Sequence, residues 1–233
     1  MHCRLQLLAA SILTVVASHS TVVNAQVVLG TDFDGRTVAG AIASNLVWTL
    51  DGIADPGDLT ASHNLFDTAD AQNRFAVDRN LHNEGSWNVD IPLAVESGNN
   101  INLSTLDLDV LIYSNAGDLQ TSQRDVDMTA ELFDSTLALL DSDTVSDIYA
   151  NSGTAVQPQG ISFDFTGNTL TAGDNFTLRL TASGQGSGNN SGIDNFVLNG
   201  QLIAVPEPAS IAMWLLVGLG VAGIGYRRSV RKW

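Results

Sequence analysis

The residues best suited to acid–base or metal chemistry are few and do not form a known catalytic pattern. Between residues 26 and 204 the histidines are His63 and His82, and the nearest glutamate, Glu84, follows His82 by two residues, which is not the spacing of an HExxH zinc helix. No GxSxG sequence offers a serine nucleophile. Glu84 and Glu131 could act as the paired carboxylates of a glycosidase, which stand about 5 to 10 Å apart. The sequence therefore predicts a protein that is not an enzyme, with a polysaccharide hydrolase as the least favoured alternative.

Two other segments match binding motifs only in part. The acidic run at residues 141–147 has the aspartate spacing of an EF-hand loop but lacks its glycine and final glutamate and has no flanking helices, so we expect a solvated loop. Residues 218–223 match GxGxxG, but they lie inside a long apolar run with no strand before them. Small residues in such a run favour close packing of a membrane helix instead.

Aromatic side chains could bind sugar rings, since a flat apolar face with polar neighbours suits a pyranose. Trp48 lies in an apolar segment and is expected in the core, whereas Trp87 lies between polar residues and is expected to be more exposed. We therefore take Trp87 and Tyr149 as candidate glycan-binding residues. The alternative is that each is simply a core residue beside a strand.

The charge of the chain is strongly acidic. The segment 26–204 contains five arginines, no lysine and 24 acidic residues. Such a surface repels phosphate, so nucleic acid is not an expected partner. It attracts divalent cations, although solubility alone would also explain it.

Hydrophobic periodicity predicts an all-β fold. In residues 106–114 the apolar side chains occupy every second position and aspartates begin the other face, which indicates a half-buried strand. The same alternation occurs in residues 126–132, 161–166 and 176–181, and shorter candidate strands are residues 46–50, 74–77, 87–93, 193–198 and 201–204. Glycine- and aspartate-rich turns separate them, including Asn199-Gly200. Only residues 65–78 and 135–140 could form a turn or two of helix. These features predict an antiparallel β-sandwich of jelly-roll type.

The N-terminus has the features of a signal peptide. Arg4 precedes a largely apolar segment, and small residues before Gln26 provide a site for signal peptidase. A retained N-terminal anchor is the alternative. Cys3 is the only cysteine, so after cleavage no disulfide could support the fold.

The C-terminus combines a proline-rich triplet, an apolar run and a basic end. The run at residues 209–226 has no charge and would rise roughly 27 Å as a helix, against a bilayer core of about 30 Å. The prolines before it disfavour helix, and the cations after it favour a cytoplasmic location. The basic residues that would stop transfer are Arg227, Arg228, Arg231 and Lys232. On these grounds alone an ordinary single-span anchor explains the segment equally well.

The order of these three parts resembles the bacterial PEP-CTERM protein-sorting domain. The resemblance covers residues 205–233, with the motif at 205–210, and implies that Pro206, Glu207 and Pro208 are recognised by exosortase, a membrane enzyme that processes the tail. It also implies an inner-membrane-anchored precursor with an outward-facing domain, then delivery to the cell surface or extracellular matrix.

The segment 191–200 is loosely similar to the closing strand of extracellular jelly-roll domains, among them carbohydrate-binding modules. Such domains often pair their first and last strands and hold a structural calcium ion there. The similarity implies that Asp32, Asp34 and Asp194 are candidate calcium ligands, since calcium takes six to eight oxygens. The alternative is that Asp194 only caps a turn.

Together these observations predict three parts: a signal peptide at residues 1–25, a β-sandwich at 26–204 and a sorting tail at 205–233. The expected function is that of an exported, non-enzymatic surface or matrix protein. A glycan-binding module that recognises extracellular polysaccharide is the alternative on the same fold.

Overall fold

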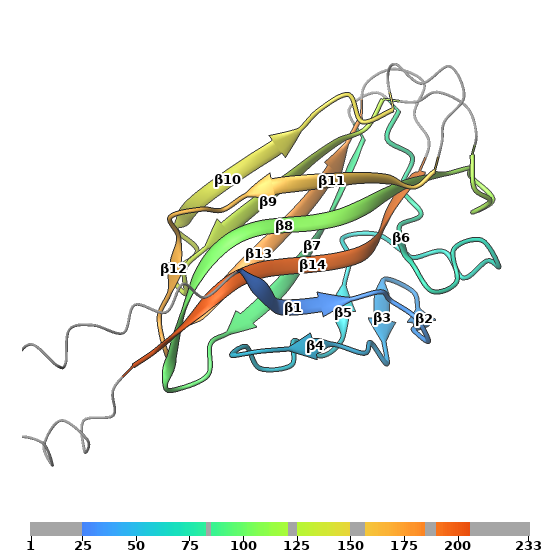
Figure 1. Ribbon diagram of the computed structural model, residues 1–233. Coiled ribbons are helices and arrows are strands. Elements are labelled where there is room, and N and C mark those ends of the chain that lie inside the picture. Colours follow the sequence, from blue (N-terminus) through green and yellow to red (C-terminus); the bar gives the residue numbers. More distant parts are fainter. Residues whose placement is uncertain (1–24, 83–84, 121–124, 150–156, 185–189, 206–233) are drawn as a thin grey trace, which may run out of the picture.

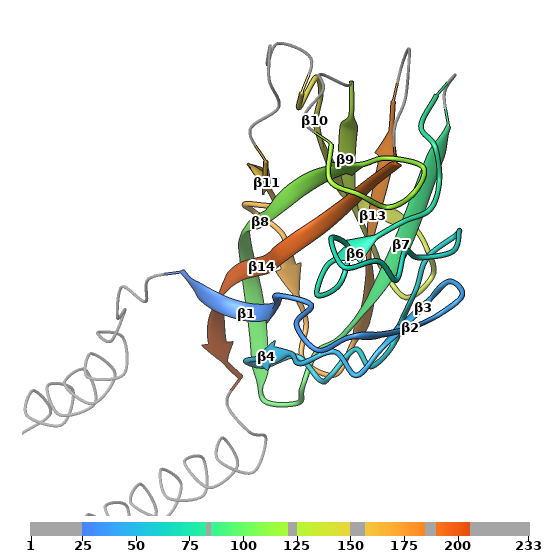
Figure 2. The ribbon, with the colours of Figure 1, turned by 90° about the vertical axis from the view of Figure 1, so that its right-hand side faces the viewer.

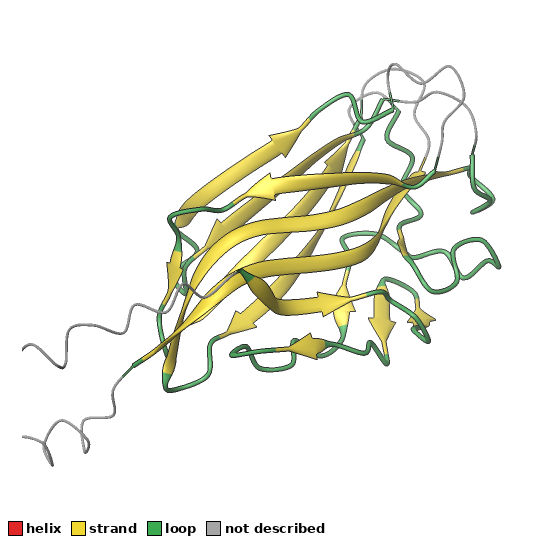
Figure 3. Cartoon of the chain, in the orientation of Figure 1, coloured by secondary structure: helices red, strands yellow, loops and turns green. Residues whose placement is uncertain are grey.

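The computed structural model describes residues 25–82, 85–120, 125–149, 157–184 and 190–205. Within these ranges the chain forms strands, turns and loops, and no helix is present (Figure 3). Accordingly, no helix in the described part of the chain is long and apolar enough to cross a membrane. Residues 1–24 of the predicted signal peptide (1–25) and the whole of the predicted membrane segment 209–226 lie outside the described residues.

The larger of two main sheets has seven strands, and its central path runs β11-β8-β14-β1-β4 (Figure 1). Its two longest strands, β8 and β14, pair antiparallel along most of their length. The short strands β12 and β6 pair with β8 and β14 respectively. The strands of this sheet are β1 (Gln26–Thr31), β4 (Thr49–Leu50), β6 (Phe75–Ala76), β8 (Asn99–Tyr113), β11 (Gln159–Asp164), β12 (Thr169–Leu170) and β14 (Asn190–Ala204).

The second main sheet has four strands in the order β10-β9-β13-β7 and faces the first (Figure 2). Its strands are β7 (Ser86–Ala94), β9 (Asp127–Phe133), β10 (Leu139–Val145) and β13 (Asn175–Ser183). A third, small sheet contains β2 (Thr37–Ala39), β3 (Ile42–Ser44) and β5 (Leu59–Thr60). The predicted antiparallel β-sandwich is therefore confirmed.

The core lies between the two main sheets and is built by the alternation that the sequence shows. On β8 the predicted inward residues are buried, with Leu106, Val110 and Ile112 at 0% exposure. On β7 and β13 every second residue is likewise buried, from Trp87 to Leu93 and from Phe176 to Ala182. Because apolar residues alternate with polar ones, each sheet turns one face to the other and one face outward.

One long edge of the sandwich is closed by aspartates rather than apolar side chains. The predicted solvated loop at residues 141–147 is wrong: most of it belongs to β10, which pairs with β9. Asp143 accepts a hydrogen bond from the amide of Asp164 on β11 (2.9 Å), and Asp141 accepts one from the side chain of Asn168 (2.5 Å). These two carboxylates link the four-stranded sheet to the edge of the larger sheet.

Two other local predictions are wrong. Asn199-Gly200 does not form a turn but a register shift inside the continuous strand β14, where a side chain at Gly200 would lie 2.9 Å from the carbonyl oxygen of Asn102. Residues 65–78 and 135–140 contain turns and strand residues but no helix. In contrast, Gly52, in the turn after β4, and Gly98, in the turn after β7, have positive φ angles of 75° and 101°.

Candidate functional site

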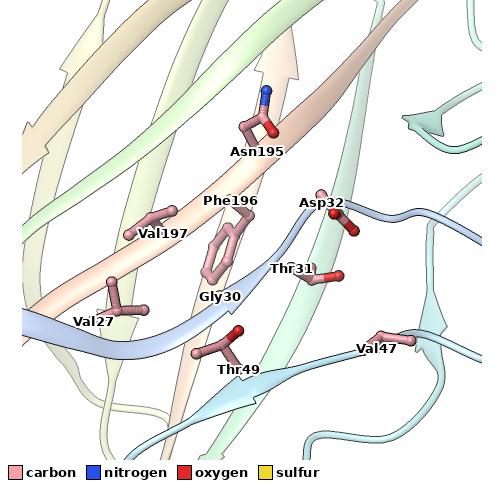
Figure 4. Close-up of a pocket in the computed structure, with 9 residues that line it drawn as sticks. All are labelled: Val27, Gly30, Thr31, Asp32, Val47, Thr49, Asn195, Phe196 and Val197. Atoms are coloured by element: carbon pink, nitrogen blue, oxygen red, sulfur yellow. The ribbon is translucent and has the colours of Figure 1, made fainter.

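The first and last strands of the sandwich meet beside a surface pocket. Thr31 at the end of β1 is opposite Phe196 on β14, and Gly30 is opposite both Val197 on β14 and Thr49 on β4. The similarity to jelly-roll domains implied this pairing of first and last strands, and the structure confirms it. The pocket opens on the outer side of these three strands (Figure 4).

The pocket has a volume of about 300 Å³ and is lined by nine residues. These are Val27, Gly30, Thr31, Asp32, Val47, Thr49, Asn195, Phe196 and Val197. Gly30 forms the floor, since a side chain there would lie 3.2 Å from the carbonyl oxygen of Phe196 and 3.3 Å from Cγ1 of Val27. A glycine inside a strand marks this kind of close approach, and it is the sequence signal by which the pocket could have been found.

Apolar and polar groups share the lining. Val27, Val47 and Val197 provide apolar walls, whereas Asp32 and Asn195 bring a carboxylate and an amide to the rim. Small-molecule sites combine apolar walls with a few fixed polar groups in this way, and about 300 Å³ is at the lower end of their usual size. The pocket could therefore bind one small polar ligand or the end of a longer one.

Asn195 is held in place by its neighbours. Its side-chain amide donates to Oδ2 of Asp109 on β8 (2.7 Å), and its backbone amide donates to Oδ1 of Asp194 (2.9 Å). Its φ is +49°, an angle that asparagine tolerates better than most residues. These contacts fix the amide group at the rim, although they use part of its donor capacity.

The three aspartates proposed as calcium ligands do not gather into one group among the described residues. Asp32 accepts a hydrogen bond from the amide of Asp34, so it stabilises a local turn at the pocket rim. Asp194 instead lies 3.5 Å from Arg74, and burial raises the pKa of its carboxyl. The structure brings Asp32 and the segment beginning at Asp194 to the same region, but it directs Asp194 towards an arginine rather than towards the other two carboxylates.

A different acidic cluster has the geometry of a cation site. Asp125, Asp127 and Asp147 each offer a carboxylate oxygen, and these oxygens all lie within 4.8 Å of one another. Oδ1 of Asp125 is buried and makes no hydrogen bond within the described structure. Partial burial and the charges of the other two residues raise the pKa of Asp125. This cluster could hold a metal ion, and the sequence did not reveal it because strand pairing assembles it from two separate segments.

Trp87 is not exposed, contrary to the expectation from sequence. Only 1% of the residue is accessible, and its indole nitrogen donates to Oγ of Ser191 on the facing sheet (2.8 Å). Its ring lies 6.3 Å from the ring of Phe75. The polar residues that flank Trp87 point outward because the strand alternates, so a polar neighbourhood in sequence coexists with a buried indole.

Tyr149 is also a core residue. It is 1% exposed, and its hydroxyl donates to the carbonyl oxygen of Val110 (2.6 Å). Trp48, expected in the core, is only partly buried: it packs edge-on against Phe196 and donates to the carbonyl oxygen of Gly57. Neither candidate aromatic therefore offers a surface platform for a sugar ring.

The candidate hydrolase pair receives no support from the described geometry. Glu131 lies on the outer face of the four-stranded sheet, opposite Arg179, which forms an ion pair with Asp90 (2.6 Å). Glu84 lies outside the described residues. His63 contacts the adjacent Ser62, whose hydroxyl oxygen also accepts the amide of Asn88. These contacts order a surface turn and give no indication of a catalytic role for His63.

Comparisons of whole folds find several solved structures with low similarity to this chain. TmCBM61 in complex with β-1,4-galactotriose shares 11% identity over 73% of this chain and 92% of that chain, with a TM-score of 0.33. The CBM22-1 xylan-binding domain from Paenibacillus barcinonensis Xyn10C shares 10% identity over 80% and 100%, with a TM-score of 0.28. The enzymatically active domain of a bacteriophage CBA120 tailspike shares 10% over 78% and 20%, with a TM-score of 0.34. At these scores the likenesses assign neither ligand nor activity to this chain.

A search of curated proteins finds no match. The comparison with protein families matches the PEP-CTERM protein-sorting motif at residues 204–232. The match begins at the last residue of β14, so the sandwich ends where the motif starts. It includes the Pro-Glu-Pro triplet and the basic end that the resemblance identified. The chain therefore carries a PEP-CTERM sorting motif, which marks it as a membrane-anchored precursor on an exosortase-dependent route of export.

Proposed function

We propose that the protein is a non-enzymatic component of the bacterial cell surface or extracellular matrix. The observation that carries this proposal is the sorting motif at residues 204–232, directly after the last strand. In this proposal signal peptidase removes residues 1–25, the sandwich at 26–204 folds outside the inner membrane, and exosortase processes the tail at 205–233. The acidic, cysteine-free sandwich needs no disulfide for stability outside the cell.

The test is intact-mass analysis of the chain recovered from membrane and extracellular fractions of its native host. We expect an extracellular species that begins near Gln26 and ends near the Pro-Glu-Pro triplet. Replacement of Pro206 and Pro208 by alanine should leave the full-length chain in the membrane, whereas Pro56→Ala, in a surface turn, should be processed normally. Wild-type chain that still ends at Trp233 in the membrane would show that the tail is only an anchor.

Glycan binding is the second candidate function, and the pocket between β1, β4 and β14 favours it. Asp32 and Asn195 can hydrogen-bond sugar hydroxyls from the rim, and Thr49 offers a hydroxyl from β4, across β1 from Asn195. The valine walls can cover the apolar face of a ring. Because the pocket is small and has no exposed aromatic in its lining, we expect it to take one sugar unit at the end or side of a polysaccharide chain.

This second function is tested by calorimetric titration of the sandwich with fragments of the host's own extracellular polysaccharide. Asp32→Asn keeps the turn-forming oxygen but removes the charge, and Thr49→Val removes the hydroxyl at constant volume. Both should weaken binding about tenfold, the effect of losing one good hydrogen bond to a ligand. The matched control is Asp34→Asn, because Asp34 is exposed and does not line the pocket. Equal loss in the control, or unchanged binding in both variants, would reject the pocket as the site.

A structural calcium ion is also part of the proposal, at Asp125, Asp127 and Asp147. Carboxylate oxygens are ligands that calcium prefers, and the unpartnered oxygen of Asp125 is the kind of group that a cation would satisfy. Bound calcium would offset two of the three like charges and link β9 to the segment after β10. Its role would be stability rather than catalysis.

A further inference from the structure

Five of the nine large apolar side chains that are exposed in the described chain lie at the end of the sandwich from which the chain continues into its sorting motif, whereas Ile42 on β3 and Val47 at the pocket are exposed elsewhere. The hairpin between β9 and β10 exposes three leucines: Leu137 at 69%, Leu139 at 53% and Leu140 at 46%. At the end of β14, Ile203 and Val205 are exposed at 40% and 38%. In Figure 1 the start of β10 and the end of β14 lie towards the same side of the molecule, at the left.

Strand register shows that these two features share one end. Phe133, the last residue of β9, is opposite Thr177 at the start of β13, which is opposite Pro92 near the end of β7. The turn after β7 leads to Gly98, whose carbonyl oxygen accepts the amide of Val205. The hairpin and the exit of the chain therefore lie on different sheets but at the same end of the strands.

The hairpin holds Leu137 outward at a conformational cost. Leu137 has φ +63°, an angle that a leucine rarely adopts. The turn around it is ordered by Asp134, whose carboxylate oxygen accepts the amides of Thr136 (2.8 Å) and Ala138 (3.0 Å). A leucine that is 69% exposed gains nothing from the core of this domain, so its position indicates a partner outside it.

The length of chain beyond Val205 identifies that partner. Three residues, Pro206 to Pro208, separate Val205 from the predicted membrane segment at 209–226, and they can span at most about 14 Å. The headgroup layer of each leaflet takes up about 5 to 7 Å of that distance. While the precursor is anchored, this end of the sandwich therefore cannot leave the neighbourhood of the bilayer.

We propose that the β9–β10 hairpin, with Leu137, Leu139 and Leu140, docks on the lipid surface beside the anchor and holds the sandwich end-on to the membrane until the tail is processed. The proposal rests on the anchored precursor of the proposed function. Glu96, Asp174 and Asp134 place negative charge at the same end, so the contact should depend on apolar burial rather than on attraction to anionic lipid. It should therefore be stronger on zwitterionic bilayers than on anionic ones and should persist at high salt.

The test uses the full-length chain, in a Cys3→Ser background, reconstituted into phosphatidylcholine vesicles with and without spin-labelled lipid. A fluorophore is attached at Ser135→Cys, in the hairpin, or at Ala116→Cys, in the exposed turn beyond the far end of β8. The 15 residues of β8 separate the two ends by about 45 to 50 Å. We expect quenching at position 135 and none at 116, and Leu137→Ser with Leu140→Ser should reduce the quenching at 135 by about half or more.

Each outcome decides a different claim. A chain that does not float with the vesicles would contradict the anchor and hence the proposed function. A floating chain in which spin-labelled lipid quenches both positions equally would overturn the docking alone. Quenching that is unchanged by the two leucine substitutions would show that the tether, not the hairpin, brings this end to the membrane, and would also overturn it. Shielding at position 135 that requires added exosortase would assign the leucines to the enzyme rather than to lipid.

Discussion

Replacing Asp147 by asparagine should stabilise the metal-free protein. Two unit charges 4.8 Å apart in water repel by about 0.9 kcal/mol, and Asp147 faces two such charges, on Asp125 and Asp127. Salt and solvent exposure reduce this sum, so we expect a gain of about 1 kcal/mol in the free energy of unfolding. For a domain of this size the midpoint of thermal unfolding should rise by about 2 to 4 °C.

Asparagine suits this position in other respects. Asp147 has φ +57°, which asparagine adopts readily, and its backbone amide keeps the hydrogen bond to Oδ1 of Asp127 (2.9 Å). The change is therefore close to a pure removal of charge. Differential scanning calorimetry in the presence of a chelator is the measurement, and Asp78→Asn, an exposed aspartate outside the cluster, is the matched control.

Calcium should reverse the order of stability. If the cluster binds calcium with a dissociation constant of about 1 mM, typical of extracellular sites, 10 mM calcium stabilises the wild type by about 1.4 kcal/mol. The variant loses a charged ligand and should gain much less. A variant that is no more stable than wild type in chelator would refute the repulsion argument, and equal calcium shifts in both proteins would refute the metal site.

Three further predictions concern the pocket and the core. The side chain of Gly30→Val would project towards Val27 and Val197, so this variant should fill the floor of the pocket and abolish glycan binding in the calorimetric titration. Its far-ultraviolet circular dichroism spectrum should remain that of a β protein. Ser191→Ala should lower the free energy of unfolding in urea by about 1 to 3 kcal/mol, since the buried indole N–H of Trp87 loses its acceptor. Ser191→Thr retains a hydroxyl and should lower it less. Burial raises the pKa of Tyr113 to about 12, so the folded protein keeps this proton between pH 10 and 12 while the unfolded chain loses it. The free energy of unfolding should therefore be unaffected by this group below pH 10 and should fall above it, and Tyr113→Phe should weaken that fall. Tyrosinate absorbance in the folded wild type follows the titration itself.

The architecture could be predicted because its strands alternate cleanly. In β7, β13 and most of β8 one face is apolar and the other polar, and glycine or aspartate follows most strands, so periodicity and turn chemistry indicate the same structure. Alternation cannot show which strands become neighbours. It also missed β2, β3, β5 and β12, because strands of two or three residues are too short to display a period. It missed β1 as well, because the apolar residues of that strand are consecutive rather than alternating.

The site residues were predicted less well because they depend on pairing between distant segments. Asp194 was placed with Asp32 since both adjoin the strands that close the sandwich, and those strands do pair. However, β6 also pairs with β14, and this pairing brings Arg74 to Asp194 instead. Asp147 and Asp127 come together only because β10 folds back on β9. No local rule in the sequence distinguishes these aspartates from the many that are simply solvated.

The acidic strand β10 shows what the distribution of charge accomplishes in this fold. Its carboxylates Asp141 and Asp143 use partners on the other sheet to close one edge, where an apolar strand would have exposed a surface prone to pairing with other chains. A few residues away on the same hairpin the chain instead exposes three leucines. Leu139 and Leu140 begin the same strand that carries these aspartates, so apolar exposure is confined to the start of β10 and charge occupies the rest. Their position at the end that leads into the sorting motif is the feature that most directly connects the sandwich to its membrane-bound stage.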